Sequence, residues 1–202
     1  MLTFKPILTL LVAFSAAAPA TAPAAAPAKR AEAVFAGGCF WCTESDFDKV
    51  PGVISTTSGY TGGKLLDPTY EKVSAGGTGH IEAVRIVYDP SRVTYATLVD
   101  HLFRTIDPLD NGGQFCDRGY QYRSAIFVAN PAEAGVAKAL KDKAAARLSK
   151  PVATLILPRR KFYPAEGYHQ DYYKKNPIRY RFYRLNCGRD ARIKAVWGAA
   201  AR

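Results

Sequence analysis

Apolar residues recur along this chain with two different periods, and the alternation of these periods predicts its secondary structure. Strand-like runs, bounded by glycine, proline and other turn residues, occupy residues 32–37, 52–63, 79–90, 122–130 and 152–158. Helical spacing predicts helices that begin near residue 39 and that cover residues 94–106, 132–148 and 165–175. This order of elements predicts an α+β fold, a two-layer sandwich in which helices cover a mixed β-sheet around a ferredoxin-like core.

The two ends of the chain depart from this pattern. Residues 1–20 combine a single charge, Lys5, with an apolar run over residues 7–14 and small residues near position 20, as a secretory signal peptide does. The apolar run is shorter than the roughly 20 residues that a membrane-spanning helix needs. Residues 21–30 read as an Ala/Pro linker and residues 31–202 as one domain, which ends in an irregular tail over residues 178–202. We therefore expect an exported, periplasmic protein with no stable membrane insertion after signal cleavage.

The net charge of +11 allows more than one kind of partner. A basic surface attracts nucleic acid or another anionic surface, or simply keeps a protein soluble. Because an exported protein rarely meets nucleic acid, we expect no nucleic-acid partner, and we expect a monomer. The alternative is a binding protein that uses the basic tail at residues 174–184 on an anionic surface or nucleic acid.

The chain has four cysteines, and the two closest, Cys39 and Cys42, lie in the stretch "GGCFWC". Two structural disulfides would suit an exported protein. Cys39 and Cys42, however, are too close in sequence to enclose a useful loop, which favours a chemical role for this pair. A zinc site is improbable, because Cys116 and Cys187 are far apart in the sequence and each histidine is isolated.

Two chemical roles remain open for the close pair. A strand followed by Cys-x-x-Cys at a helix start is typical of a thioredoxin-like disulfide oxidoreductase, which would use both Cys39 and Cys42. The other role is a single nucleophile, Cys39, beside a pocket wall formed by Phe40 and Trp41. In either case the helix N-terminus is expected to lower the pKa of Cys39 and make it reactive.

Longer motifs give a more specific indication. They read "GGCFW.TES.F....GV.....GYTGG", then "PTYE.V..G.TGH.EAV.I.YDP", then "D.G.QYRS.I" and finally "FYPAE.YHQ.Y..KNP". In this order, across roughly residues 31–177, they resemble the class A peptide methionine sulfoxide reductases, enzymes that reduce one epimer of methionine sulfoxide. The resemblance implies that residues 31–202 form a catalytic domain and that methionine S-sulfoxide, free or in proteins, is the substrate. It also implies that a thioredoxin-like dithiol is the reductant and that no cofactor or metal takes part.

The resemblance implies roles for several residues of the first three motifs. Cys39 is the nucleophile, and Phe40 and Trp41 wall the pocket for the substrate methyl group. The sulfoxide oxygen is held by Tyr70, Glu82 and Tyr122. This agrees with the chemistry, because the oxygen is a poor leaving group unless an acid protonates it. Glu82 would be that acid if burial keeps it protonated, and the tyrosine hydroxyls would stabilise the developing charge.

The last motifs are implied to bind the substrate main chain through Asp117, His169 and Tyr172. His169 and Tyr172 lie three positions apart, hence on one face of the predicted helix over residues 165–175. A sulfenic acid left on Cys39 must then be resolved by a second thiol.

The identity of that second thiol is the point at which this chain departs from the common family pattern. Cys187 lies in the predicted tail, which could swing over the active site, so we expect Cys187 to resolve Cys39. Cys42 is the second choice. Cys116 is expected to be a relay or a structural partner.

Overall fold

The computed structural model describes residues 1–2 and 29–198. The predicted signal peptide and most of the predicted linker therefore lie outside the described residues. Within the described part of the chain, no helix is both long enough and apolar enough to cross a membrane.

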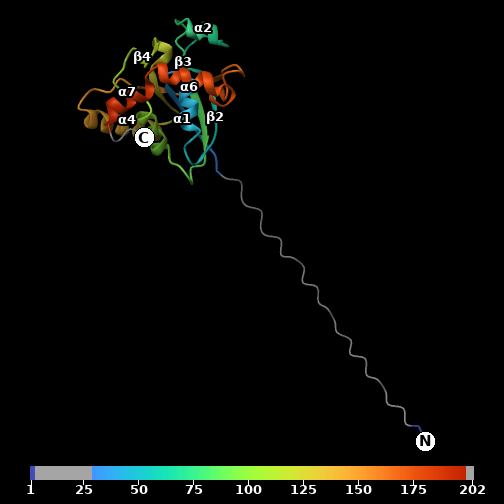
Figure 1. The fold of residues 1–202 in the computed structure, drawn as a ribbon. Helices are drawn as coiled ribbons and strands as arrows, with labels where there is room; N and C mark the ends of the chain where they lie inside the picture. Colours follow the sequence, from blue (N-terminus) through green and yellow to red (C-terminus); the bar gives the residue numbers. More distant parts are fainter. Residues whose placement is uncertain (3–28, 199–202) are drawn as a thin grey trace.

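One β-sheet forms the centre of the fold (Figure 1). Its strands lie in the order β7-β6-β1-β3-β2-β8. The strands are β1 (Ala31–Gly37), β2 (Val53–Thr61), β3 (Ile81–Tyr88), β6 (Ser124–Val128), β7 (Leu155–Pro158) and β8 (Tyr163–Pro164). Neighbouring strands are antiparallel except β6 and β7, which are parallel. The expected mixed sheet is confirmed, and each predicted strand is present.

Helices connect the strands in the expected order. The longer ones are α1 (Phe40–Phe47), α3 (Tyr95–Arg104) and α4 (Pro131–Leu148). The succession β1, α1, β2, β3, α3, β6 with the sheet order β6-β1-β3-β2 is the ferredoxin-like arrangement. The predicted α+β class and core are therefore confirmed, and β7 and β8 extend the sheet at its two edges.

The central strand β1 is buried on both faces. Phe35 packs in the main core with Phe47 of α1 and Leu102 of α3. Val34, which points to the other face as strand periodicity requires, packs in a second cluster with Phe127 of β6. Since β1 is also paired along both edges, its C-terminal end is a rigid base for the turn that follows.

Short elements occupy the longer connections. They are α2 (Tyr70–Ser74), β4 (Gly113–Gln114), β5 (Asp117–Arg118), the 3-10 helix η1 (Tyr120–Tyr122) and α5 (Tyr172–Lys175). β4 and β5 pair as a small antiparallel sheet, so the polar stretch after α3 contains a hairpin as well as a loop.

The predicted helix over residues 165–175 is wrong for most of its length, because only α5 is helical. Asp171 adopts a left-handed conformation with φ of 54° and interrupts the segment. The Gln170 side-chain amide donates to the carbonyls of Ser58 and Ala165, both at 2.9 Å, and accepts the N–H of Ser58 at 2.9 Å. These tertiary hydrogen bonds attach the segment to β2 and outweigh its helical propensity.

The C-terminal tail is also not irregular in its described part. It forms α6 (Pro177–Asn186) and α7 (Arg189–Trp197), which meet at Gly188, where φ is 64°. The helices bury Tyr180, Arg184, Arg189, Ile193 and Trp197. The prediction failed because two of these core-facing residues are arginines, which conceal the apolar period of the helices.

Candidate active site

The turn that follows β1 positions Cys39. Gly38 has φ of 84°, and a Cβ atom at this residue would lie 2.5 Å from the Cβ of Gln114, so the position requires glycine. The turn makes Cys39 the N-cap residue of α1, the helix start predicted from the sequence. The Cys39 side chain is only 7% exposed.

Cys39 faces a small cavity of about 60 Å³. Segments that are far apart in the sequence meet around it, and the lining residues are Cys39, Phe40, Trp41, Tyr70, Glu82, Asp117, Tyr122 and Tyr183. All of these except Tyr183 were selected from the sequence. The structure therefore brings the predicted nucleophile, acid, hydroxyl and wall residues to one place.

Glu82 is the buried carboxyl of the cavity. It is the second residue of β3 and is 2% exposed, and its Oε2 accepts the N–H of Phe40 at 3.0 Å. Burial raises the pKa of Glu82 to about 8, so the carboxyl is protonated at neutral pH. A protonated carboxyl can donate a proton to a group that enters the cavity.

Tyr70 and Tyr122 complete the polar part of the lining. Burial raises the pKa of both, that of Tyr70 to about 12, so both hydroxyls keep their protons and can donate hydrogen bonds. Tyr70 is fixed by Glu166, whose carboxylate accepts the Tyr70 N–H at 2.9 Å and the Tyr60 hydroxyl at 2.9 Å. Glu166 lies within the last sequence motif, where we assigned it no role.

Trp41 connects the cavity wall to the segment before α6. Its indole N–H donates to Nδ1 of His169 at 3.0 Å, and its ring stacks on Tyr172 with centroids 3.7 Å apart and planes at 6°. His169 and Tyr172 therefore meet at one side chain, but His169 lies in a turn and not on the predicted helical face. Neither residue lines the cavity itself.

His169 carries an unused donor. Its Nδ1 accepts the Trp41 N–H, and burial lowers its pKa, so the neutral ring holds its proton on Nε2. Nε2 is buried and has no hydrogen-bond partner, although Oε2 of Glu166 lies 3.9 Å away. A buried N–H without a partner is available to a ligand carbonyl.

Tyr183 of α6 is the lining residue that sequence reasoning missed. Its hydroxyl donates to Oδ2 of Asp117. Burial raises the pKa of Tyr183 and that of Asp117. The residue lies in the stretch "RYRFYR", which we read as a basic tail, and no local pattern indicates that position 183 reaches the cavity.

The two cysteines of α1 are free and buried, and their thiols interact with each other. The expected lowering of the Cys39 pKa by the helix N-terminus is wrong. Burial raises the pKa of Cys39, and the hydrogen bond to Cys42 raises it further. The same hydrogen bond, followed by the charges of Arg189 and Arg184, lowers the pKa of Cys42 to about 7.

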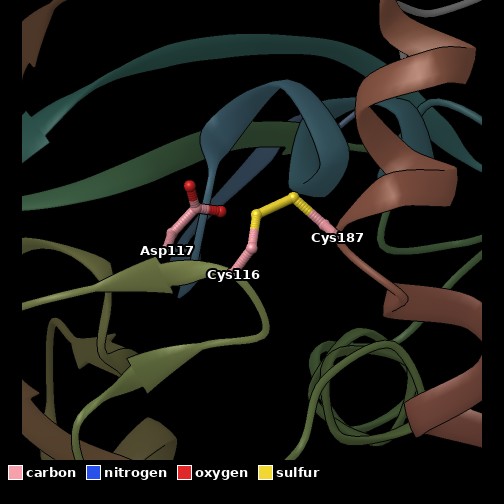
Figure 2. Close-up of side chains that lie close together, drawn as sticks. All are labelled: Cys116, Asp117 and Cys187. Carbon is pink, nitrogen blue, oxygen red and sulfur yellow. A yellow bond between two sulfur atoms is a disulfide. The ribbon is translucent and has the colours of Figure 1, made fainter.

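The other two cysteines are joined. Figure 2 shows the Cys116–Cys187 disulfide between the β4–β5 hairpin and the end of α6, beside Asp117. Cys187 is therefore held in place between two helices, in contrast to the mobile tail that we expected. Among the described residues, Cys116, Asp117 and Cys187 are the only cluster with metal-ligand geometry, and the disulfide leaves it without a thiolate.

The fold and the cavity together define a class of protein, an α+β enzyme with a buried cysteine beside a protonated carboxyl and tyrosine hydroxyls. The family model for peptide methionine sulfoxide reductase matches residues 31–201. Peptide methionine sulfoxide reductase MsrA 2 of Rhizobium meliloti is 56% identical over 169 residues, which are 84% of each chain. The protein therefore belongs to the peptide methionine sulfoxide reductase family.

Solved structures agree with this assignment. Mxr1 from Saccharomyces cerevisiae in reduced form matches with a TM-score of 0.71 and 34% identity, over 76% of this chain and 89% of that chain. The structure of Mxr1 in complex with Trx2 matches with a TM-score of 0.50 and 23% identity, over 73% of this chain and 87% of that chain. At that identity the second likeness supports the fold alone.

Proposed function

We propose that this protein reduces the S epimer of methionine sulfoxide, free or in proteins, to methionine. The observation that carries the proposal is the cavity in which the Cys39 sulfur lies with the protonated Glu82 carboxyl and the hydroxyl-bearing residues Tyr70 and Tyr122. Relatives named for this activity belong to the same family.

The first step transfers oxygen from the substrate to Cys39. The Glu82 carboxyl protonates the sulfoxide oxygen, the Cys39 sulfur attacks this oxygen and forms a sulfur–oxygen bond to it, and the tyrosine hydroxyls stabilise the charge as it develops. The sulfur–oxygen bond of the substrate breaks, and methionine leaves as a thioether with that electron pair. The oxygen remains on Cys39 as a sulfenic acid, and the proton of the Cys39 thiol returns to Glu82.

The second step forms a disulfide, and the structure favours Cys42 as the resolving thiol. Cys42 is free and hydrogen-bonded to Cys39, whereas Cys187 is bonded to Cys116. We therefore place Cys42 before Cys187, the reverse of the order expected from the sequence. The Cys42 sulfur attacks the Cys39 sulfur, the Cys39–oxygen bond breaks, and the hydroxyl group leaves with a proton as water.

An external dithiol then reduces the disulfide and is itself oxidised. We propose a thioredoxin-like protein as this partner, because Mxr1, whose reduced form is 34% identical to this chain, is named in a complex with Trx2. The substrate side chain is proposed to contact Phe40 and Trp41, and its main chain to contact Asp117, His169 and Tyr172. The free donor on His169 supports this last assignment.

The activity is tested with separated sulfoxide epimers and dithiothreitol as the reductant. We expect methionine from the S epimer and none from the R epimer. Reduction of unrelated protein disulfides without sulfoxide turnover would instead support the thioredoxin-like alternative. Arg184 of the basic tail would not take part in binding to an anionic surface, because it is buried and paired with Asp46 and Asp190.

We also propose that the mature enzyme is an exported, periplasmic monomer. The Cys116–Cys187 disulfide supports export, because disulfides persist in oxidising compartments. Cell fractionation with sequencing of the mature N-terminus tests the location, and sedimentation tests the oligomeric state. Unprocessed chain in the cytoplasm would contradict the proposed export.

A further inference from the structure

Arg189, at the start of α7, is a buried cation that takes no direct part in the two proposed chemical steps. The side chain is 2% exposed. Its Nη2 donates to the carbonyl oxygen of Gly37 at 3.1 Å and to that of Thr105 at 2.9 Å. Gly37 begins the turn that carries Cys39, so the last helix of the fold is connected directly to the active-site turn.

The charge of Arg189 is only loosely balanced. Its nearest carboxylate is Asp46, with Nε and Oδ2 3.7 Å apart, and neither of these atoms has a hydrogen-bond partner. Asp46 instead pairs closely with Arg184 of α6, at 3.0 Å. A cation that is desolvated and weakly paired acts more strongly on other groups nearby than a well-paired one.

Cys42 lies beside this charge, because Asp46, whose Oδ2 is 3.7 Å from Arg189 Nε, follows Cys42 by four residues on the same face of α1. The thiol is 2% exposed, and burial alone would disfavour its thiolate. Charged or titratable groups face Cys42 from α1, β3, α6 and α7, and they are Cys39, Asp46, Glu82, Tyr180, Arg184 and Arg189. Of these, Arg184 and Arg189 favour the thiolate permanently, whereas the Cys39 thiol is consumed in the first step.

We propose that Arg189 is a positioning residue for the second step: it holds the Gly37–Cys39 turn and stabilises the Cys42 thiolate that attacks the Cys39 sulfenic acid. This inference rests on the proposed function, in which Cys42 is the resolving thiol. The attack forms the Cys39–Cys42 bond, breaks the Cys39–oxygen bond and releases the hydroxyl group, which takes a proton to become water.

The second disulfide helps to hold Arg189 in place. Cys187 precedes Arg189 by two residues, and Phe115, which precedes Cys116, lies with its ring centroid 4.6 Å from the guanidinium carbon. The Cys116–Cys187 bond, which Figure 2 shows, therefore joins the segment that contains Phe115 to the segment that contains Arg189. This gives the bond a function in placing the cation, separate from electron transfer.

The test separates the two chemical steps by rapid quenching after mixing with S-sulfoxide and no reductant. Methionine release, with loss of the Cys39 thiol, reports the first step, and loss of the second free thiol, that of Cys42, reports the second step. In Arg189→Gln we expect one methionine per enzyme, and disulfide formation about fivefold slower at pH 7. Because the pKa of Cys42 is about 7, a rise of one unit lowers its thiolate fraction at pH 7 from about one half to about one tenth. The pH midpoint of the second step should rise accordingly.

Arg189→Lys is the conservative variant, because it keeps the charge but not the planar pair of donors. In Arg189→Lys the pH midpoint of disulfide formation should stay at the native value, although the rate of disulfide formation falls. Arg192→Gln is the matched control on the same helix, since Arg192 pairs with Asp107 at 2.7 Å, and it should leave the midpoint unchanged.

Equal midpoint shifts in the lysine and glutamine variants, or no shift in either, would overturn the proposal. Failure of the proposed resolving role of Cys42 can be distinguished from failure of the Arg189 proposal. If Cys42 is not the resolving thiol, Cys42→Ser with native Arg189 should show normal thiol loss and normal cycling. Thermal unfolding of each variant identifies any general loss of structure.

Discussion

The two cysteine pairs of this protein differ in spacing, burial and bonding. Cys39 and Cys42 lie on one turn of α1, are buried and remain free thiols. Cys116 and Cys187 are 71 positions apart, join a hairpin to the end of α6, and form a disulfide in which Cys116 is exposed. The close pair lies beside the cavity and the protonated carboxyl. The distant pair, by contrast, closes a much longer segment of the chain.

This difference indicates a division of labour. A disulfide between close residues removes little chain entropy, so the first pair contributes little to stability when oxidised. A bond that closes a segment of 71 residues removes much more. The close pair is therefore suited to chemistry and the distant pair to holding α6 and α7, which supply Tyr183 and Arg189, against the active-site turn.

Removal of either thiol of the close pair should have the largest effect on turnover. Cys39→Ser should lower the S-sulfoxide reduction rate by more than about a thousandfold, because a hydroxyl replaces the nucleophile. Cys42→Ser should release one methionine per enzyme at near the native rate and then stop with a thioredoxin-type donor. Methionine counting in single and multiple turnovers measures both effects. Continued cycling of Cys42→Ser would return the resolving role to Cys187.

Glu82→Gln should slow the first step by roughly a hundredfold, corresponding to about 3 kcal/mol of transition-state stabilisation. In the native enzyme the acid form of Glu82 is lost as pH rises through about 8, so the rate of the first step should fall there. The variant should lack that fall. A native single-turnover rate in Glu82→Gln would show that another group protonates the oxygen.

The Glu82 carboxyl, which should speed the reaction, should lower the stability of the native protein as pH rises. Its folded pKa of about 8 lies above its unfolded value, so the folded state binds more protons between these values and native stability falls as pH rises through this range. Glu82→Gln removes this cost. The free energy of unfolding of Glu82→Gln minus that of the native protein, both measured with urea, should therefore increase from about pH 5 to pH 8.

Much of this architecture could be predicted from local pattern. The periods around β1, β3, α3 and α4 gave the class of fold, because these elements are apolar on the faces that they bury. Seven of the residues that we selected from the long motifs line one cavity. His169 and Tyr172 do not line it, and they contact Trp41 instead. The motif residues lie in loops close to rigid strand ends. Their positions along the sequence therefore allowed us to predict that they come together in the fold.

The parts that could not be predicted depend on long-range contacts. Arg184 faces the interior because Asp46 pairs with it, and Arg189 does so because two backbone carbonyl oxygens accept its hydrogen bonds. No apolar period in the sequence indicates either contact. Tyr183 reaches the cavity only because α6 packs there. The pKa of Cys39 was predicted in the wrong direction because a helix N-terminus is evident from sequence, whereas burial is not.

The smallest expected effect on turnover comes from the distant pair. With a thioredoxin-type donor, Cys116→Ser/Cys187→Ser should turn over within about threefold of the native rate, because neither residue lines the cavity. Its free energy of unfolding should nevertheless fall by about 4 kcal/mol, the value for a closed segment of 71 residues. Urea unfolding of the double variant and the oxidised native protein measures this, with Cys42→Ser as the control that should change little. If the double variant instead stalled after one methionine at native stability, the distant pair would be the chemical one and the comparison would be reversed.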